Sequence, residues 1–453
     1  MKRLTLLAAT LAVALFAPRP AHAFCGFYVG KAGAELYNHA SKVVLVRDGN
    51  RTVLTMSNDF EGNMKDFALV VPVPTVLEKD QIHVGDKKYI DRIDSYSAPR
   101  LVEYSDPNPC QVYNYRSMAP MAAGAGLAST KKDDLADDRE ERAKALGVKI
   151  EAEYSVGEYD IAILSAKQSD GLETYLKEQG YQIPAKAAAA LEPYIKQNMK
   201  FFVAKVNLDE QKNTGVTYLR PIQIAYESEK FMLPIRLGMA NAKGAQDLLV
   251  YTLTRKGRVE SANYKTVNVP TDSEVPEYIQ QEFPKFYGAV FAKAHKQSDY
   301  RAVHTEYVWN AGSCDPCVDS PLTTEEMKGL GVFWLDAAQQ QSYHGYYAGG
   351  TAVVTRLHVR YDAEHFPEDL VFQETGDQST FQARYILRHP FKGDLSCPAG
   401  EQYKKALDTR HQQELNTLAS LTGWSKAAIA HRMGNDAPGA DPANQPWYKR
   451  LWK

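Results

Sequence analysis

The stretch Lys42-Val-Val-Leu-Val-Arg-Asp-Gly-Asn-Arg-Thr-Val-Leu-Thr-Met-Ser57 decides the fold class of this chain. Two runs rich in β-branched residues flank Asp48-Gly49-Asn50. Asp-Gly and Gly-Asn tolerate the positive φ of a tight turn, so the stretch predicts a β-hairpin. The apolar run Phe67–Val73 predicts a third strand, central in its sheet. The body of the protein is therefore expected to be rich in β-structure.

The rest of the chain mixes strand and helix patterns. Helices alternate with strands once and strands then run in series, so we expect an α+β fold with mixed or antiparallel sheets, a few packed helices and a helical C-terminal segment. Further strands are expected at 100–104, 150–156, 159–166, 201–208, 218–226, 231–237, 247–254, 351–361, 371–374 and 381–387. Helices are expected at 86–95, 170–179, 184–198, 276–295, 320–329, 401–421 and 425–433.

Composition divides the chain into six regions, because a mature chain of about 430 residues exceeds one hydrophobic core. Residues 118–144 combine small residues with dense charges of both signs, which is typical of a flexible connector; a lid or a partner-binding loop is the alternative. The regions are a signal peptide (1–23), an N-terminal β-rich region (24–117), the connector (118–144), a central α+β region (145–270), a β-rich region with a Cys-x-x-Cys loop (271–396), and a helical C-terminal segment with a tail (397–453).

The N-terminus has the pattern of a secretory signal peptide. Two basic residues precede an apolar run at 4–16, and cleavage is predicted between Ala23 and Phe24. The run is too short to span a bilayer core of about 30 Å. Lipid attachment at Cys25 is a weaker alternative, because Phe24 occupies the position that requires a small residue. We therefore expect a periplasmic or secreted protein without a transmembrane anchor after cleavage.

The charge balance limits the possible partners. The chain has 53 basic and 55 acidic residues and a formal net charge of −2. This balance excludes the broad basic surface of a nucleic-acid-binding protein. An unidentified envelope or extracellular partner is expected instead.

Two neighbouring cysteines form the sharpest local motif, Cys314-Asp-Pro-Cys317. In an oxidising compartment the pair is predicted to form a small structural disulfide. A redox dithiol, half of a zinc site and an unbonded pair are the alternatives. Redox catalysis requires a sulfur at a helix N-terminus, whereas the next predicted helix begins near residue 321. Zinc requires two further ligands, and none lies at a recognisable spacing.

The other three cysteines leave the pairing open. Cys25 and Cys110 flank the first sheet region and are expected to clip the N-terminus to it, which leaves Cys397 as a possible free thiol. Bonding of Cys25 or Cys110 to Cys397 is equally compatible with the spacing.

Catalytic and metal-binding motifs are absent from the sequence. It contains no Gly-x-Ser-x-Gly, His-Glu-x-x-His or phosphate-loop pattern, so no catalytic, cofactor-binding or metal-binding residue is assigned. An acidic patch is expected to be a solvated loop, with a divalent-cation site as the alternative. Its residues are Asp362, Glu364, His365, Glu368 and Asp369. Structural, hydrogen-bonded imidazoles are expected at His304, His344, His358 and His389.

Several segments together resemble a bacterial exported family catalogued as domain of unknown function 2330. They are Phe24-Cys-Gly-Phe-Tyr-Val29, Phe67-Ala-Leu-Val-Val-Pro-Val-Pro74, Ser97-Ala-Pro-Arg-Leu101, Val156-Gly-Glu-Tyr-Asp160, Leu219-Arg-Pro221 and Cys314-Asp-Pro-Cys317. The resemblance implies a secreted or envelope-associated β-rich protein, and it supplies no activity, cofactor or catalytic residue.

These features favour a non-enzymatic binding or interaction module of the cell envelope, because a large folded body carries no recognisable catalytic constellation. The alternatives are a thiol–disulfide redox protein that uses Cys314 and Cys317, and a hydrolase whose residues are dispersed in the sequence.

Overall fold

A computed structural model of the chain describes residues 21–22, 27–30, 37–38, 41–57, 60–61, 67–111, 146–179, 187–215, 218–240, 244–318, 320–335, 342–343, 346–347 and 352–438. The predicted signal-peptide cleavage site, Cys25, the connector and the tail after residue 438 lie outside these residues.

The hairpin that opens the fold forms as predicted. β4 (Ser41–Asp48) and β5 (Arg51–Ser57) pair antiparallel, and Gly49 has a φ of 58° in the turn between them. Their ten-stranded sheet has the order β17 (Lys265–Asn268), β19 (Ala302–Asn310), β22 (Val353–Tyr361), β15 (Gln246–Thr254), β4, β5, β13 (Ile222–Glu227) and β8 (Ile82–Val84), with β1 (Ala21–His22) on β15 and β24 (Phe381–Gln382) on β19.

A second, five-stranded sheet packs against the first. Its order is β10 (Val148–Val156), β11 (Tyr159–Ala166), β12 (Lys200–Val206), β7 (Phe67–Val73) and β2 (Phe27–Gly30). Apolar side chains of the two sheets meet in one core, where Val43 and Leu248 lie in the same cluster as Val71 and Phe202. β7 lies inside the second sheet, as its continuous apolar run predicts.

Four small sheets or ribbons complete the described strands. They are β14 (Met232–Leu233), β23 (Leu370–Glu374) and β16 (Val259–Ser261); β18 (Ser273–Glu274), β25 (Arg384–His389) and β9 (Arg100–Ser105); β20 (Ser342–Tyr343) with β21 (Tyr346–Tyr347); and β3 (Tyr37–Asn38) with β6 (Phe60–Glu61). β25 pairs parallel with both β18 and β9.

Helices cover the outer faces of both large sheets. α4 (Ser169–Glu178) and α5 (Ala187–Lys196) cover the five-stranded sheet. α2 (Lys87–Ser97) and α9 (Thr324–Gly329) cover part of the ten-stranded sheet. α8 (Ile279–Gln297) contacts the same sheet through Tyr287, which binds Glu306 of β19, and Phe291, which stacks on His358 of β22. The remaining helices are α6 (Leu208–Asn213), α7 (Arg236–Ala240), α10 (Pro398–Thr422) and α11 (Lys426–Met433), with 3-10 turns η3 (Lys79–Gln81) and η5 (Gly434–Asp436).

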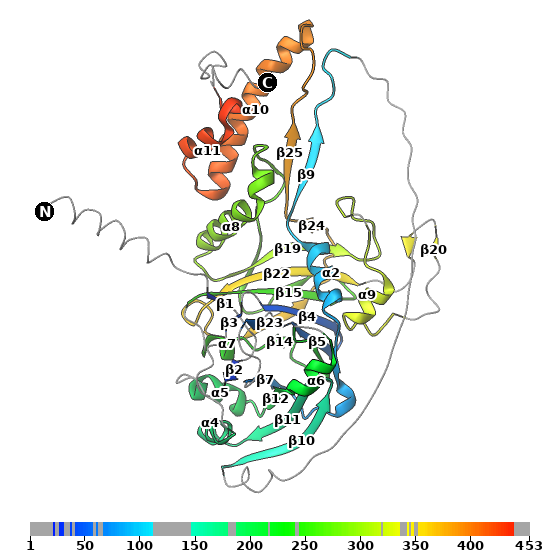
Figure 1. The fold of residues 1–453 in the computed structure, drawn as a ribbon, viewed down its shortest axis with the longest axis vertical. Helices are drawn as coiled ribbons and strands as arrows, with labels where there is room; N and C mark the ends of the chain where they lie inside the picture. Colours follow the sequence, from blue (N-terminus) through cyan, green and yellow to red (C-terminus); the bar gives the residue numbers. More distant parts are fainter. Residues whose placement is uncertain are drawn as a thin grey trace, which may run out of the picture.

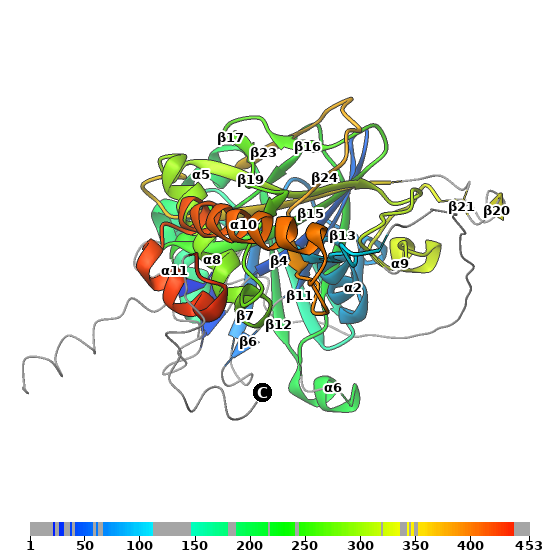
Figure 2. The ribbon, with the colours of Figure 1, turned by 90° about the horizontal axis from the view of Figure 1, so that it is seen from above.

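The main layers are therefore helix, sheet, sheet and helix. An additional C-terminal cap consists of α10, α11 and η5, which pack against α8 and β25. In Figure 1, α4 and α5 lie at the lower end, and α10 and α11 lie at the upper end beside the β9–β25 ribbon. Seen from above in Figure 2, α10 crosses over the ten-stranded sheet next to α8 and α11. The helices of the cap share a core with β25, to which Phe286, Tyr385 and Leu418 contribute. The α+β class and the helical C-terminal segment are thus as predicted.

Several predicted elements differ from the structure. The segment expected as one strand at 381–387 is divided between β24 and β25, which belong to different sheets, and the strand expected at 218–226 begins only at Ile222. The strand expected at 231–237 is limited to β14, and α7 begins at Arg236. Pro234 cannot donate to a strand ladder, and the carboxylate of Asp369 accepts the backbone N–H of Ile235 and of Arg236, so the chain turns into a helix. The helix expected from residue 320 begins at Thr324, where Thr323 and Glu326 form a capping box.

Candidate functional site

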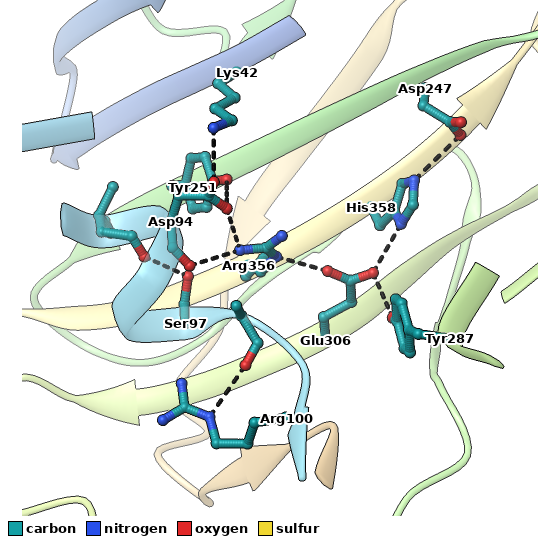
Figure 3. A network of polar contacts seen from close by, with 12 residues as sticks. Lys42, Asp94, Ser97, Arg100, Asp247, Tyr251, Tyr287, Glu306, Arg356 and His358 are labelled. Carbon is teal, nitrogen blue, oxygen red and sulfur yellow. Dashed lines mark hydrogen bonds and ion pairs between the residues drawn. The ribbon is translucent and has the colours of Figure 1, made fainter. Parts of the chain in front are cut away.

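A polar cluster lies on the helix-covered face of the ten-stranded sheet. Alternate residues of β22 point to one face, which places Arg356, His358 and Arg360 in a row. Lys42 of β4, Asp247 and Tyr251 of β15 and Glu306 of β19 surround this row (Figure 3). These positions are interior to the sheet, so their charges require partners.

Glu306 is the centre of this cluster and is 1% exposed. Its carboxylate accepts hydrogen bonds from Arg356 Nε at 2.6 Å, His358 Nδ1 at 2.7 Å and Tyr287 Oη of α8 at 2.5 Å (Figure 3). Burial opposes ionisation, but the charges of His358 and Arg356 outweigh it and lower the pKa of Glu306 to about 2. The carboxylate is therefore ionised, and it holds α8 to the sheet.

His358 bridges two carboxylates. Its Nδ1 lies 2.7 Å from Glu306, and its Nε2 lies 3.2 Å from Asp247 Oδ1. Carboxylates only accept hydrogen bonds, so both ring nitrogens must carry protons. Burial opposes this charge, but the two carboxylates outweigh it and raise the pKa of His358. An imidazolium with both nitrogens bonded has no lone pair with which to activate a nucleophile.

Asp94 attaches α2 to the same cluster. It accepts hydrogen bonds from Arg356 Nη1 at 2.7 Å and from Tyr251 Oη at 2.7 Å, and it pairs with Lys42 Nζ at 2.6 Å. Burial opposes ionisation, but Arg356 and Lys42 lower the pKa of Asp94 to about 2. The cluster thus fixes two helices on one sheet face and offers no free base. Its geometry indicates a structural role.

Two further histidines beside the cluster have ring nitrogens without a hydrogen-bond partner in the described part of the chain. His304 is 0% exposed, and neither of its ring nitrogens is hydrogen-bonded; Nδ1 of His295 is likewise unpaired. Burial lowers the pKa of His304 to about 3 and that of His295 to about 4, so both rings are neutral. The expectation of a hydrogen-bonded imidazole is therefore wrong for His304. It is confirmed for His358, and for His389, which contacts Glu277 and Glu103; His344 lies outside the described residues.

The cysteines pair differently from the first expectation. Cys110 is bonded to Cys397, which joins the chain after β9 to the N-cap of α10. The assignment of Cys397 as a free thiol is wrong, and one of the alternative pairings is the observed one. The expected clip between Cys25 and Cys110 is excluded by the same bond. Cys314 and Cys317 are unbonded, so the predicted staple between them is not formed.

Hydrogen bonds hold the Cys314–Cys317 loop instead of a disulfide. Asp315 is 2% exposed, and it accepts from Tyr307 Oη at 2.8 Å, Gln382 Nε2 at 2.7 Å and the backbone N–H of Cys317 at 2.9 Å. Arg100 donates to the Cys317 carbonyl at 2.8 Å. Neither sulfur lies at a helix N-terminus, because α9 begins only at Thr324. A helix N-terminus, one of the features that activate a redox dithiol, is therefore not present at this loop. The loop does have a cation beside it, because Arg384 Nη1 lies 3.9 Å from Cys317 Sγ.

The acidic patch is divided among separate partners. Asp362 accepts from His365 Nδ1 at 2.8 Å, Glu368 pairs with Arg236, and Asp369 accepts from Tyr194 Oη at 2.7 Å. Within the described ranges, no group of three or more His, Cys, Asp or Glu side chains is placed to hold a metal ion. The carboxylates of this patch serve the local fold.

A second ion pair, with a buried carboxylate, joins residues that are 62 positions apart in the sequence. Glu158 is 0% exposed and is bound by Arg220 Nη2 at 2.6 Å and Nε at 3.1 Å. Gly157, with a φ of 57°, precedes it, and a Cβ there would lie 2.9 Å from the Arg220 guanidinium. The close approach therefore requires glycine. This pair locks the β10–β11 turn to the entry of β13.

An apolar pocket of about 270 Å³ lies among the described residues. Residues of both large sheets and of β14 form it: Leu54, Pro72, Pro74, Met199, Tyr226, Met232 and Pro234 are apolar or aromatic, and Gln197, Ser228, Glu229 and Lys230 are polar. Burial raises the pKa of Tyr226 to about 12, so its phenol is a neutral hydrogen-bonding group. Sequence reasoning did not find this pocket, because its residues come from four separate segments of the chain.

Comparison with known proteins gives a family and no activity. The sequence model of a bacterial family described as "Uncharacterized protein conserved in bacteria (DUF2330)" matches residues 19–373, and the chain belongs to this family. No curated protein and no solved structure matches it. Among the helices that the structure describes, none has the length and apolar character needed to cross a membrane. The match ends before β25, α10 and α11.

Proposed function

We propose that this family member is an exported, non-enzymatic binding module of the cell envelope, and that the apolar pocket holds the apolar part of its ligand. The pocket carries the proposal, because it combines an apolar wall with a few polar groups at its rim, as small-molecule sites do. Its volume of about 270 Å³ suits a small ligand or one apolar group of a larger ligand.

Part of the pocket wall belongs to paired strands, which favours a preformed site. Pro72 lies within β7, and it is paired across the sheet with Phe201 of β12. Tyr226 lies in β13 and is 8% exposed. A rigid apolar wall reduces the entropy that a ligand loses on binding. At the rim, Lys230 Nζ donates to Gln197 at 2.7 Å, so the polar groups are also held in place.

The polar cluster supports a non-enzymatic role. Its only charged imidazole, His358, has both nitrogens bonded to carboxylates. The neutral imidazoles of His295 and His304 are almost fully buried and contact Phe291. General base catalysis requires a base within hydrogen-bond reach of a substrate, and these rings have no such access. Export is supported by the basic and apolar N-terminal segment, and a mature N-terminus at Phe24 in the mass spectrum of the exported protein would verify it.

Binding of the neutral fluorophore N-phenyl-1-naphthylamine tests the pocket. Met232 is half-buried in the pocket wall, so Met232→Trp fills the cavity. Val76→Trp is the matched control, because Val76 is 40% exposed and lies outside the pocket. We expect saturable binding that weakens about tenfold in Met232→Trp and is kept in Val76→Trp. Equal binding by the wild type and a folded Met232→Trp would refute the proposal.

A further inference from the structure

The C-terminal half of α8 rests on the ten-stranded sheet through one stripe of side chains. Tyr287, Phe291 and His295 recur every four residues, so they share one face of the helix. Tyr287 binds the central carboxylate of the polar cluster, and the Phe291 ring stacks on His358 of β22 with 3.6 Å between the ring centroids. Val290, on the neighbouring stripe, packs in the core of the C-terminal cap. α8 therefore lies between the cap and the sheet (Figure 1).

Two buried imidazoles meet where α8 contacts the sheet. His295 of α8 is 4% exposed, His304 of β19 is 0% exposed, and their ring centroids are 5.7 Å apart. Both nitrogens of His304 and Nδ1 of His295 have no hydrogen-bond partner among the residues that the structure describes. Buried polar atoms without partners are unfavourable, and an apolar ring would fill either position without this cost. The stability of the fold therefore does not explain two histidines at this contact.

The charges around the two rings are already balanced. The titratable and charged groups that face the rings from the sheet and the adjoining loops are Asp247 of β15, Glu306 of β19, His358 and Arg360 of β22, Tyr300 and His365. Asp247 accepts from Arg360 Nε and Nη2 at 2.8 and 2.7 Å, and it shares His358 with Glu306. His365 is held by Asp362. A proton on His295 or His304 would therefore add a positive charge for which this group of side chains offers no free carboxylate.

Protonation of the two rings is unfavourable while α8 lies on the sheet. Burial, aided by the charges of Arg360 and His358, lowers the pKa of His295 to about 4, and Asp247 opposes this shift. Burial, aided by His295 and His358, lowers the pKa of His304 to about 3. A hydrated imidazole has a pKa of about 6.5. Below this pH, acid therefore favours any state in which the two rings reach water.

The backbone departs from regular geometry at both ends of this part of α8. Glu282 is not helical, with a φ of −119° and a ψ of 18°, and Pro284 follows it within the helix. After the helix, Asp299 and Tyr300 have φ values of 52° and 58°, which are unfavourable for a bulky side chain such as that of tyrosine. Tyr300 N–H donates to the carbonyl of His295 at 3.0 Å, so this strained turn is attached directly to the histidine contact. A backbone change at these two places can move the helix without a change in the strands.

We propose that His295 and His304 form an acid-sensitive switch, which holds the C-terminal half of α8 on the sheet at neutral pH and releases it in acid. Protonation of both rings places two further positive charges beside His358 and Arg360. The helix then leaves the sheet at the turn formed by residues 299–300, and its release relieves the strain of that turn. Release brings both imidazoles to water and exposes Phe291, which is 1% exposed in the neutral form. The proposal is independent of the apolar pocket.

Amide hydrogen–deuterium exchange of the full-length protein at pH 6.5, 5.5 and 4.5 tests the switch, with each rate corrected for the intrinsic exchange rate at that pH. A released helix of about ten residues has little stability of its own, so its amides should exchange. We expect the opening constant of residues 288–297 to rise nearly 100-fold from pH 5.5 to pH 4.5, because each ring contributes about tenfold per pH unit. The amides of β7 should stay protected, which distinguishes local release from global unfolding.

Histidine variants assign the response to the two rings. His295→Phe and His304→Phe each remove one titrating ring, so each should reduce the rise to about tenfold, and the double variant should reduce it to less than about threefold. His431→Phe is the matched control, because His431 is exposed on α11, and it should respond like the wild type. An opening constant of wild-type α8 that is equal at pH 5.5 and pH 4.5 would overturn the proposal whether or not the variants fold. A rise that β7 shares equally, or an unchanged rise in a folded double variant, would overturn it as well.

Discussion

The polar cluster on the ten-stranded sheet predicts a large and coupled loss of stability when its central carboxylate is removed. Glu306→Gln keeps the shape of the side chain and removes the charge that faces Arg356 and His358. Removing one partner of a buried ion pair typically costs about 3–5 kcal/mol, because the other charge is left uncompensated. Arg356 keeps Asp94 and His358 keeps Asp247, so we expect a loss near the lower end, about 3 kcal/mol.

Urea unfolding at pH 7 measures this loss, and a double-mutant cycle attributes it to the pair. Arg356→Met removes the partner charge, and the double variant leaves neither charge unpaired. We therefore expect the double variant to be more stable than the sum of the single losses predicts, by at least about 1 kcal/mol. Glu227→Gln is the control, because Glu227 is 74% exposed in its pair with Arg51 and should cost less than about 1 kcal/mol.

The acid limb of the stability curve gives a second measurement of the same carboxylate. The pKa of Glu306 falls from 4.5 to about 2 on folding, so its contribution is present above the unfolded pKa and is lost as the pH falls towards 2. Glu306→Gln should therefore lose stability less steeply than the wild type in this interval. A loss below about 1 kcal/mol at pH 7, or strictly additive single variants, would refute the reasoning.

Four further outcomes are expected. In thermal melts, the stability of His304→Phe relative to the wild type should be higher at pH 5 than at pH 8. The folded wild type keeps this ring neutral down to about pH 3, so the wild type loses stability as the pH falls below 6.5, whereas the variant has no ring to protonate there. Cys110→Ser should lower the free energy of unfolding by up to about 5 kcal/mol, because the bridge spans 287 residues, and the melting temperature should fall with it. Dithiothreitol should then have no further effect on the melting temperature of this variant. Glu158→Gln should cost about 1–3 kcal/mol in urea unfolding, since it removes the carboxylate that binds Arg220, whose side chain is one-third exposed and remains partly hydrated. Asp315→Asn should speed the reaction of Cys317 with a thiol reagent, because it weakens the bonds that hold the loop.

Local turn chemistry and apolar runs were sufficient to predict most of the strands. The β4–β5 hairpin follows from Asp48-Gly49-Asn50, and β7 follows from an unbroken apolar run. Both signals are local, so they can be read without knowledge of the partner strands.

The strand β19 was not predicted, and its composition explains the omission. Ala302–Asn310 includes His304 and Glu306, which suggest an exposed segment, yet its first seven residues are buried. Their burial is possible because charges on β22 and a hydroxyl group on α8 come to Glu306. These partners lie 19 to 52 residues away, so no local pattern contains them. The centre of the polar cluster was therefore invisible to sequence reasoning.

The prediction of the cysteine pairing was wrong for a related reason. Cys397 is bonded to Cys110 because β25 pairs parallel with β9, so the segments that follow these two strands leave the sheet at the same end. Sequence spacing contains no information on such a register. The prediction for Cys314 and Cys317 rested on spacing and compartment alone, whereas the loop is held by a buried aspartate between them.

Four of the segments on which the family resemblance rests connect distant elements, and another lines the apolar pocket. Glu158 of one segment binds Arg220 of another, and Arg100 of a third binds the carbonyl of Cys317 in a fourth. Each of these contacts joins elements that are distant in sequence, so they specify the fold. The segment that includes Pro72 is different, because Pro72 is paired with Phe201 of β12 in the five-stranded sheet and also lines the apolar pocket. Substitutions at the contacts between distant segments should therefore reduce stability and the proposed ligand binding together. Substitutions at the pocket surface should reduce binding without a loss of stability. The pocket is therefore the place at which a function can be measured separately from folding.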